Sequence, residues 1–170
     1  MLVEVRHNGA RLVAASSTIT RPENTTAYSS GDLVANSVTA SEVNALQFQG
    51  FDAGAAGEVL GARIQKSTNS VTNAAFRLHL STVIPTFATN GDNDAISTNT
   101  VMTAKGWLGY VDITAMTGFS AVAWGAGAVD SSRLLLPYVL ATTIIYGVLE
   151  ARGAYTPGSA EVFSFWLIAR

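Results

Sequence analysis

The side chains that most often perform catalysis are scarce in this chain. It has two histidines, His7 and His79, and no cysteine. Neither histidine has a second histidine at the spacing of a metal-ligand pair, and no serine lies in a G-x-S-x-G nucleophile elbow. His79 alternates with apolar residues beside Arg77, so we expect a surface or hydrogen-bonded strand residue. The glycine-rich stretch GFDAGAAGEVLG lacks a Walker lysine and does not fit G-x-G-x-x-G. The sequence therefore predicts no hydrolytic or redox activity and no cofactor.

One short acidic run, NGDNDA, has the oxygen-rich character of a cation site. Asp92 and Asp94 flank Asn93, and calcium loops use carboxylates at such alternating positions. The EF-hand frame with its later glutamate is missing. We therefore interpret the run as a solvated turn and keep the two aspartates only as weak metal candidates.

Three isolated glutamates raise the question of glycoside hydrolysis, which uses a pair of carboxyl groups across the scissile bond. They are Glu58, Glu150 and Glu161. Lone carboxylates in a sparsely charged chain are usually surface groups, and sequence spacing gives no geometry. A glycan-degrading enzyme is therefore the least favoured of the functions that we consider.

The three tryptophans suit contact with sugars. Trp107 and Trp124 lie close to predicted turns, whereas Trp166 lies inside an apolar stretch. Large aromatic side chains dominate the interiors of β-sandwiches, so we expect all three to pack in the core. Exposure of Trp107 or Trp124 on a concave face would instead indicate a carbohydrate- or receptor-binding module.

Strands must position these residues, because no stretch shows a helical hydrophobic period. Short alternating or apolar runs are separated by clusters of Gly, Asn, Asp, Ser and Pro, which is typical of all-β proteins. The predicted strands cover residues 2–6, 11–15, 32–35, 45–51, 58–66, 75–83, 106–113, 120–124, 142–151 and 161–169. We expect one all-β domain over residues 1–170, a two-sheet β-sandwich of jelly-roll-like form. Residues 1–9 are expected to form an extended N-terminal arm.

Two predicted strands differ in their patterns. In FRLHLSTV, the apolar residues Phe76, Leu78 and Leu80 share one face, which predicts a half-buried strand. The stretch EVFSFWLIA is apolar on both faces, which predicts cover on both sides, by a loop or by another subunit. The last two strands together predict a long hairpin, with a type II turn at residues 156–159 and Gly158 at positive φ.

Composition favours an assembly. The chain has 170 residues, is 48% hydrophobic and 13% charged, and has a net charge of -2. Such a surface provides little electrostatic repulsion between molecules, so we expect an oligomer. Lysines and arginines are scattered singly, so we expect no nucleic-acid partner. The run LLLPYVLATTIIYGVL is broken and too short for a membrane span, and the first residues do not resemble a signal peptide.

Three stretches resemble, in order and spacing, a group of small virion proteins of tailed bacteriophages and prophages. They are TRPENTTAYSSGDLVANS, FRLHLSTVIPTFATNGDNDAI and YGVLEARGAYTPGSAEVFSFWLIAR, and they span most of the chain. The resemblance implies a head decoration or cement protein, made in the cytoplasm of the bacterial host. Such a subunit is a β-sandwich or jelly roll, homotrimeric, seated on the capsid exterior and bound to the major capsid protein. The stretch GFDAGAAGEVLGARIQKS matches this group less closely.

A cement protein would contact its neighbours through extended polar segments. The candidates are the N-terminal segment and residues 21–32, where Pro22 restricts the backbone and biases its predecessor towards an extended conformation. The predicted partner-contact residues are Met1, Leu2, Val3, Glu4, Arg21, Glu23, Asn24 and Tyr28. A connection that only covers the edge of its own sheet is the equal alternative for the polar segment. A carbohydrate- or receptor-binding module of a phage tail or fibre is the alternative function.

Overall fold

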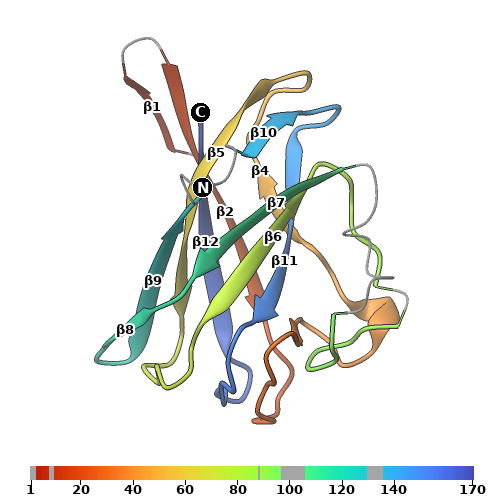
Figure 1. The fold of residues 1–170 in the computed structure, drawn as a ribbon, viewed down its shortest axis with the longest axis vertical. Coiled ribbons are helices and arrows are strands. Elements are labelled where there is room, and N and C mark those ends of the chain that lie inside the picture. The colour runs from red at the N-terminus through yellow and green to blue at the C-terminus, as the bar shows by residue number, and fades with distance from the viewer. Residues whose placement is uncertain (1–2, 8–9, 88, 97–105, 130–135) are drawn as a thin grey trace.

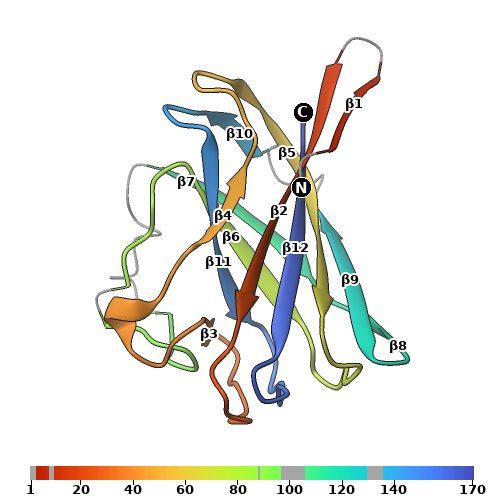
Figure 2. The same ribbon diagram turned by 180° about the vertical axis from the view of Figure 1, so that it is seen from behind.

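The computed structural model describes residues 3–7, 10–87, 89–96, 106–129 and 136–170, with side chains from Leu12 onward. The described residues form two antiparallel β-sheets packed face to face, so the predicted all-β, two-sheet sandwich is confirmed (Figures 1 and 2). The elements are β1 (Val3–His7), β2 (Ala10–Thr20), β3 (Leu33–Val34), the 3₁₀-helix η1 (Ala40–Glu42), β4 (Leu46–Gln49), β5 (Ala56–Lys66), β6 (Phe76–Ser81), β7 (Trp107–Ile113), β8 (Met116–Phe119), β9 (Val122–Ala128), β10 (Leu136–Val139), β11 (Ile144–Ala151) and β12 (Val162–Ala169).

The order of the strands shows how the chain builds the two layers. The seven-stranded sheet has the order β1-β2-β12-β5-β9-β8, with β10 also paired to β5. The five-stranded sheet has the order β3-β11-β6-β7, with β4 also paired to β11. The sequences β2-β12-β5-β9 and β4-β11-β6-β7 thus face each other across the core. This alternation of the chain between two sheets matches the predicted jelly-roll form.

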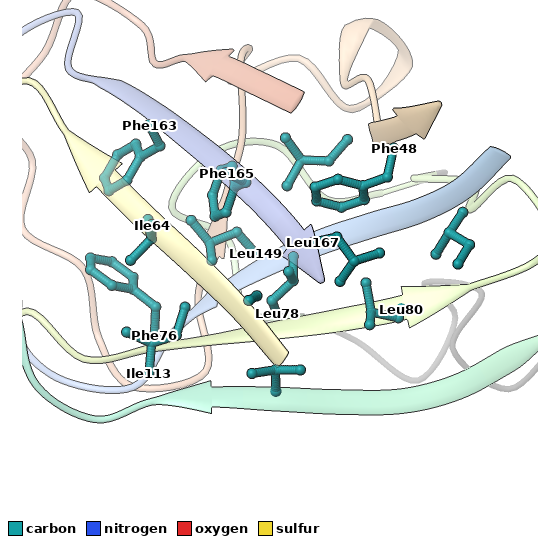
Figure 3. Packing of buried hydrophobic residues seen from close by; sticks show 14 of the residues in the cluster. Phe48, Ile64, Phe76, Leu78, Leu80, Ile113, Leu149, Phe163, Phe165 and Leu167 are labelled. Atoms are coloured by element: carbon teal, nitrogen blue, oxygen red, sulfur yellow. The ribbon is translucent and has the colours of Figure 1, made fainter. Parts of the chain in front are cut away.

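The core lies between the sheets and follows the alternation of side chains along each strand (Figure 3). Phe163, Phe165 and Leu167 of β12 are fully buried against the residues of the opposite sheet, among them Leu78 and Leu80 of β6. Each such side chain contributes roughly 1.5–3 kcal/mol through its removal from water. The predicted inward face of FRLHLSTV is therefore confirmed.

Two short strands, β8 and β10, were not predicted, because neither MTGF nor LPYV has a period long enough to be recognised. Pro137 lies within β10, which pairs only with β5 among the described strands. Proline lacks the N–H that a second neighbour would need, so it is tolerated in such an edge strand. Strand β2 continues to Thr20, beyond the predicted range of 11–15, because residues 13–20 pair with β12 and Ile19 is buried in the core.

The predicted hairpin at the C-terminal end is wrong. Strand β11 belongs to the five-stranded sheet and β12 to the seven-stranded sheet, so residues 152–161 cross from one layer to the other. Gly158 does not have positive φ, and the left-handed residue of this connection is Ala160, at φ 50°. The physical reason is that β11 and β12 both carry core-facing side chains, which pack against each other from opposite sheets.

The described residues of the predicted N-terminal arm form a paired strand, which corresponds to the strand predicted over residues 2–6. Strand β1 pairs with β2 in antiparallel register, from Val3 opposite Ala14 to His7 opposite Ala10. The resulting hairpin extends beyond the body of the sandwich (Figures 1 and 2). Pairing satisfies backbone groups that a free arm would leave to water. Val3 and Glu4 therefore lie in a strand, whereas Met1 and Leu2 fall outside the described residues.

Loops cover part of the outer face of the five-stranded sheet. Residues 35–45 and the described parts of 82–96 lie side by side in both views (Figures 1 and 2). There they form a second apolar cluster, built by Leu33, Ala35, Phe87 and Val148. Exposed aromatic side chains occur on both sheets: Phe119 and Trp124 on the seven-stranded sheet, and Trp107 of β7 on the five-stranded sheet.

Candidate interaction surface

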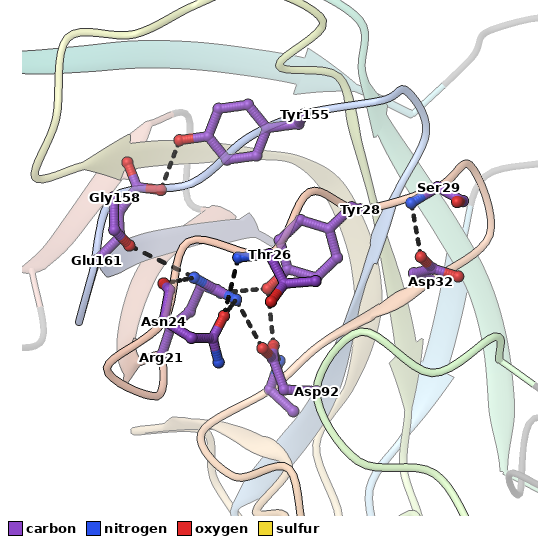
Figure 4. Close-up of polar contacts among 11 residues, drawn as sticks. Arg21, Asn24, Thr26, Tyr28, Ser29, Asp32, Asp92, Tyr155, Gly158 and Glu161 are labelled. Carbon is purple, nitrogen blue, oxygen red and sulfur yellow. Dashed lines mark hydrogen bonds and ion pairs between the residues drawn. The ribbon is translucent and has the colours of Figure 1, made fainter.

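Arg21 and Tyr28, predicted as partner contacts, are internal residues. Each is only 2% exposed, and both converge on the carboxylate of Asp92 (Figure 4). Arg21 Nη2 donates to Asp92 Oδ2 at 2.7 Å, and the Tyr28 hydroxyl donates to Oδ1 at 2.7 Å. The backbone N–H of Ala35 donates to the same Oδ1 at 2.8 Å. The prediction for Arg21 and Tyr28 is therefore wrong, since these polar groups bind within the chain.

The rest of the predicted polar segment supports this buried network. Asn24 is partly buried, and its Oδ1 accepts hydrogen bonds from Arg21 Nη2 at 3.2 Å and from the N–H of Thr26 at 3.2 Å. Glu23 is exposed. The segment thus closes one end of its own sandwich, which agrees with the alternative reading of the sequence as an intramolecular connection.

The two weak metal candidates have different surroundings. Asp92 is buried, and its carboxylate accepts the three protein donors described above, so the prediction of a solvated turn is wrong for this residue. Asp94 is exposed, and its Oδ2 accepts the backbone N–H of Gly91, three residues earlier in the chain, at 2.7 Å. Among the described residues, no group of three or more His, Cys, Asp and Glu side chains is placed to hold a metal ion.

Burial controls the protonation of the network. Removal from water raises the pKa of the Tyr28 hydroxyl, and the negative charge of Asp92 raises it further. Tyr28 therefore keeps its proton and acts as a hydrogen-bond donor to Asp92.

A second buried network lies beside the first. Lys66 Nζ is 3.2 Å from Glu161 Oε1, and the hydroxyls of Thr68 and Tyr155 donate to the same carboxylate. Burial lowers the pKa of Lys66, and the nearby charge of Glu161 offsets part of that effect. The rings of Tyr28 and Tyr155 lie parallel with centroids 6.4 Å apart, which joins the two networks.

The three glutamates considered for glycoside hydrolysis are not brought together. Each contacts different side chains: Glu58 contacts Arg170, Glu150 contacts His79 and Arg152, and Glu161 contacts Lys66. Glu58, in β5, lies beside the C-terminal end of β12, whereas Glu161 directly precedes the first residue of β12. Glu150 lies in the other sheet. Burial alone would raise the pKa of Glu150, but its hydrogen bonds from His79 and Arg152 outweigh burial and lower it.

The tryptophans are more exposed than we predicted. Trp107 is 47% exposed and Trp124 is 37% exposed, so the prediction of core packing is wrong for both. Trp166 is half-buried, and its ring stacks on that of Trp124 with centroids 5.2 Å apart and planes 21° apart.

On β9 the core side is occupied by Ala123 and two glycines, because a larger residue would collide with the facing strand. At Gly127, a Cβ would lie 2.1 Å from the carbonyl oxygen of Asp112 in β7.

The stacked tryptophans belong to a continuous, almost uncharged surface, which we call the outer face of the seven-stranded sheet. The cross-strand register and the alternation of side chains define its members. They are Leu12, Ala14, Ser16, Thr18 and Thr20 of β2, Val162, Ser164, Trp166 and Ile168 of β12, Gly61, Arg63 and Gln65 of β5, Val122, Trp124, Ala126 and Ala128 of β9, and Thr117 and Phe119 of β8. Among these positions, Arg63 alone is charged.

The five-stranded sheet has the opposite character on its outer side. There Arg77 pairs with Asp112 at 2.6 Å, and Arg152 pairs with Glu150 at 2.7 Å. A face that meets only water is ordinarily the polar one. In this molecule the less charged face carries the exposed Trp124 stacked on Trp166, which is the composition of an interface core.

The sequence reasoning missed this surface because its members are dispersed over five strands, which come together only through sheet pairing. One signal was available: EVFSFWLIA is apolar on both sides, and the structure places Trp166 and Ile168 on the outer face. No described helix is long and apolar enough to cross a membrane. No protein-family model and no curated protein matches this chain, so the outer face must be interpreted from its own chemistry.

Proposed function

We propose that this chain is a structural virion subunit of the capsid-decoration type, which binds the major capsid protein through the outer face of the seven-stranded sheet. The observation that carries the proposal is an open, almost uncharged sheet face with Trp124 stacked on Trp166 at its centre. The resemblance of three sequence stretches to small phage virion proteins supports the location on the capsid exterior.

The physical chemistry of the face suits attachment to a protein lattice. Removing a charged group from water on binding costs free energy, and among the positions of this face only Arg63 carries a charge. Tryptophan is the residue type most enriched among those that dominate binding energy. A partner that binds only the assembled lattice raises the free energy needed to rupture it, so many modest contacts would stabilise the shell.

Self-association is a separate part of the proposal. The low charge density and the resemblance both favour a homotrimer. Light scattering of the purified protein over a wide range of concentration, and of the protein released from particles, measures its mass. A monomer under both conditions would refute the trimer and leave attachment to the capsid to be judged by its own test.

The attachment test places a charge at the centre of the face. In Trp124→Asp, a carboxylate replaces an exposed ring, so the fold should persist while the interface must bury an unpaired charge. We expect the copy number on purified particles of the encoding phage to fall at least about tenfold, as for loss of a binding hot spot. Val38→Asp is the matched control, because Val38 is exposed beside the other sheet.

Particle composition and thermal melting together decide the outcome. Full occupancy by folded Trp124→Asp protein would show that the outer face is not the attachment surface. Loss of occupancy only in Val38→Asp would assign attachment to the other side of the sandwich. Absence of the native chain from the particles would refute the virion function itself.

A further inference from the structure

A cleft of about 370 Å³ lies along β7, on the side of that strand away from β6. Its volume falls within the range of small-molecule sites. The polar and aromatic side chains that line it are Trp107, Tyr110, Asp112 and Thr114, and Leu136 of β10 adds an apolar wall. Gly109, at φ +131°, permits the close approach of Leu136, since a Cβ there would lie 2.5 Å from Leu136 Cδ2.

Three of these side chains project from the same face of β7. In the pairing of β7 with β6, Tyr110 lies opposite His79 and Asp112 opposite Arg77, and a register shift between Leu80 and Ser81 brings Trp107 opposite Ser81, on the same side as His79 and Arg77. Residues opposite each other in an antiparallel pair share a face of the sheet. Trp107 therefore presents a half-exposed ring on the side where the Asp112 carboxylate offers hydrogen-bond acceptors.

The carboxylate is held in a fixed orientation. Arg77 donates from Nε to Asp112 Oδ1 at 2.6 Å and from Nη2 to Oδ2 at 2.9 Å. The same guanidinium lies over the Tyr110 ring, 3.7 Å from its centroid. A carboxylate has about four acceptor sites, and this bidentate pair uses two of them. The side chain of Asp112 is 38% exposed, so its remaining acceptor sites can be reached from the cleft.

Charge selects the class of ligand. A cationic ligand would meet the positive charge of Arg77, which already occupies a face of Tyr110. An anionic ligand would meet Asp112, which already takes two donors of Arg77. A neutral molecule with an apolar face and several hydroxyls avoids both conflicts. Its apolar face can stack on the ring of Trp107, and its hydroxyls can donate hydrogen bonds to the carboxylate of Asp112.

We propose that this cleft binds a neutral pyranose sugar, stacked on Trp107 and hydrogen-bonded to Asp112. The proposal does not depend on the attachment function, because the cleft and the outer face of the seven-stranded sheet share only Ala128 among their described members. A sugar site on a decorated capsid would give the particle a contact with glycans independent of its assembly.

The test is a titration of the isolated protein with methyl glycosides of glucose, galactose and mannose and with N-acetylglucosamine. Ligand-observed NMR and tryptophan fluorescence report binding. We expect saturable binding of at least one sugar, with Kd on the order of 1 mM. Trp107→Ala should weaken it at least about tenfold, whereas Trp107→Phe, which keeps an aromatic face, should restore most of it. Val38→Ala is the control that should bind as the native protein does.

Several results would overturn the proposal. They are no saturable binding of any of these sugars, binding that Trp107→Ala leaves unchanged, and tighter binding of choline or inorganic phosphate than of the sugars. Asp112→Asn provides a second variant, with melting curves to verify its fold, and unchanged sugar affinity in it would remove the carboxylate from the site. Since these measurements use no particles, they fail or succeed separately from the attachment test.

Discussion

Replacing Asp92 by alanine is expected to be among the most destabilising single changes in this protein. The substitution removes the acceptor of three buried donors, which belong to Arg21, Tyr28 and Ala35. It leaves the guanidinium of Arg21 without its counter-ion in a site where the side chain is 0% exposed. Removing one partner of a buried ion pair typically costs about 3–5 kcal/mol, because the other charge stays desolvated.

The three hydrogen bonds share one carboxylate, so their separate contributions do not add, and we expect a total loss of about 4 kcal/mol. For a chain of this length, a loss of that size lowers the melting temperature by roughly 8–16 °C. It also removes a large share of a total stability of about 5–15 kcal/mol. Urea unfolding followed by circular dichroism measures the change, provided that the m value stays constant.

Three further variants separate the ion pair from other effects. Asp94→Ala is the local control, since its exposed carboxylate caps a turn and its loss should cost no more than about 1 kcal/mol. Tyr28→Phe removes the donor to Asp92 and the acceptor of Arg21 Nε, so it should cost about 1–3 kcal/mol. The double change Arg21→Met with Asp92→Leu should recover much of the loss, because no unpaired charge is then buried. A loss below about 1 kcal/mol in Asp92→Ala would refute the reasoning.

Three other predictions concern the core, the contact between sheets and pH. Phe165→Ala should lower stability by about 3–5 kcal/mol in urea unfolding, since a fully buried ring is replaced by a cavity; an effect like that of an exposed residue would place β12 outside the core. Gly127→Val should prevent soluble expression or lower the melting temperature strongly, because its Cβ would lie 2.1 Å from a β7 carbonyl oxygen, and native-like melting would contradict this contact between sheets. The pKa of Glu150 is lowered below 4.5 in the folded chain, so its ionised form stabilises the fold above that pH, and this contribution is lost as pH falls through the folded-state pKa. Melting curves of Glu150→Gln and the native protein should therefore differ at pH 7 and converge in acid, and a constant difference would exclude this titration.

Several features followed from the sequence because they depend on neighbouring residues along the chain. The alternation in FRLHLSTV places Phe76, Leu78 and Leu80 on one side whatever partner strand is found, since successive side chains of a strand point to opposite faces. The absence of a helical period, together with regularly spaced turn residues, likewise predicted an all-β sandwich. The two-sided apolar pattern of the last strand indicated an outer surface that differs from ordinary solvent-facing sheet.

The tertiary structure alone decided which polar residues are internal and which apolar ones are exposed. Arg21 and Asp92 are 71 residues apart in the sequence, so no local pattern shows that the polar segment around Arg21 is buried. The buried network forms only when folding brings Arg21 and Asp92 into contact. Trp124 and Trp166 stack across β5 because the strand order places β9 and β12 on either side of it, and that order depends on pairing between distant segments. Side-chain direction is a local property of a strand, whereas the neighbour that a side chain meets depends on register and sheet order, and these come from the free energy of the whole packed chain.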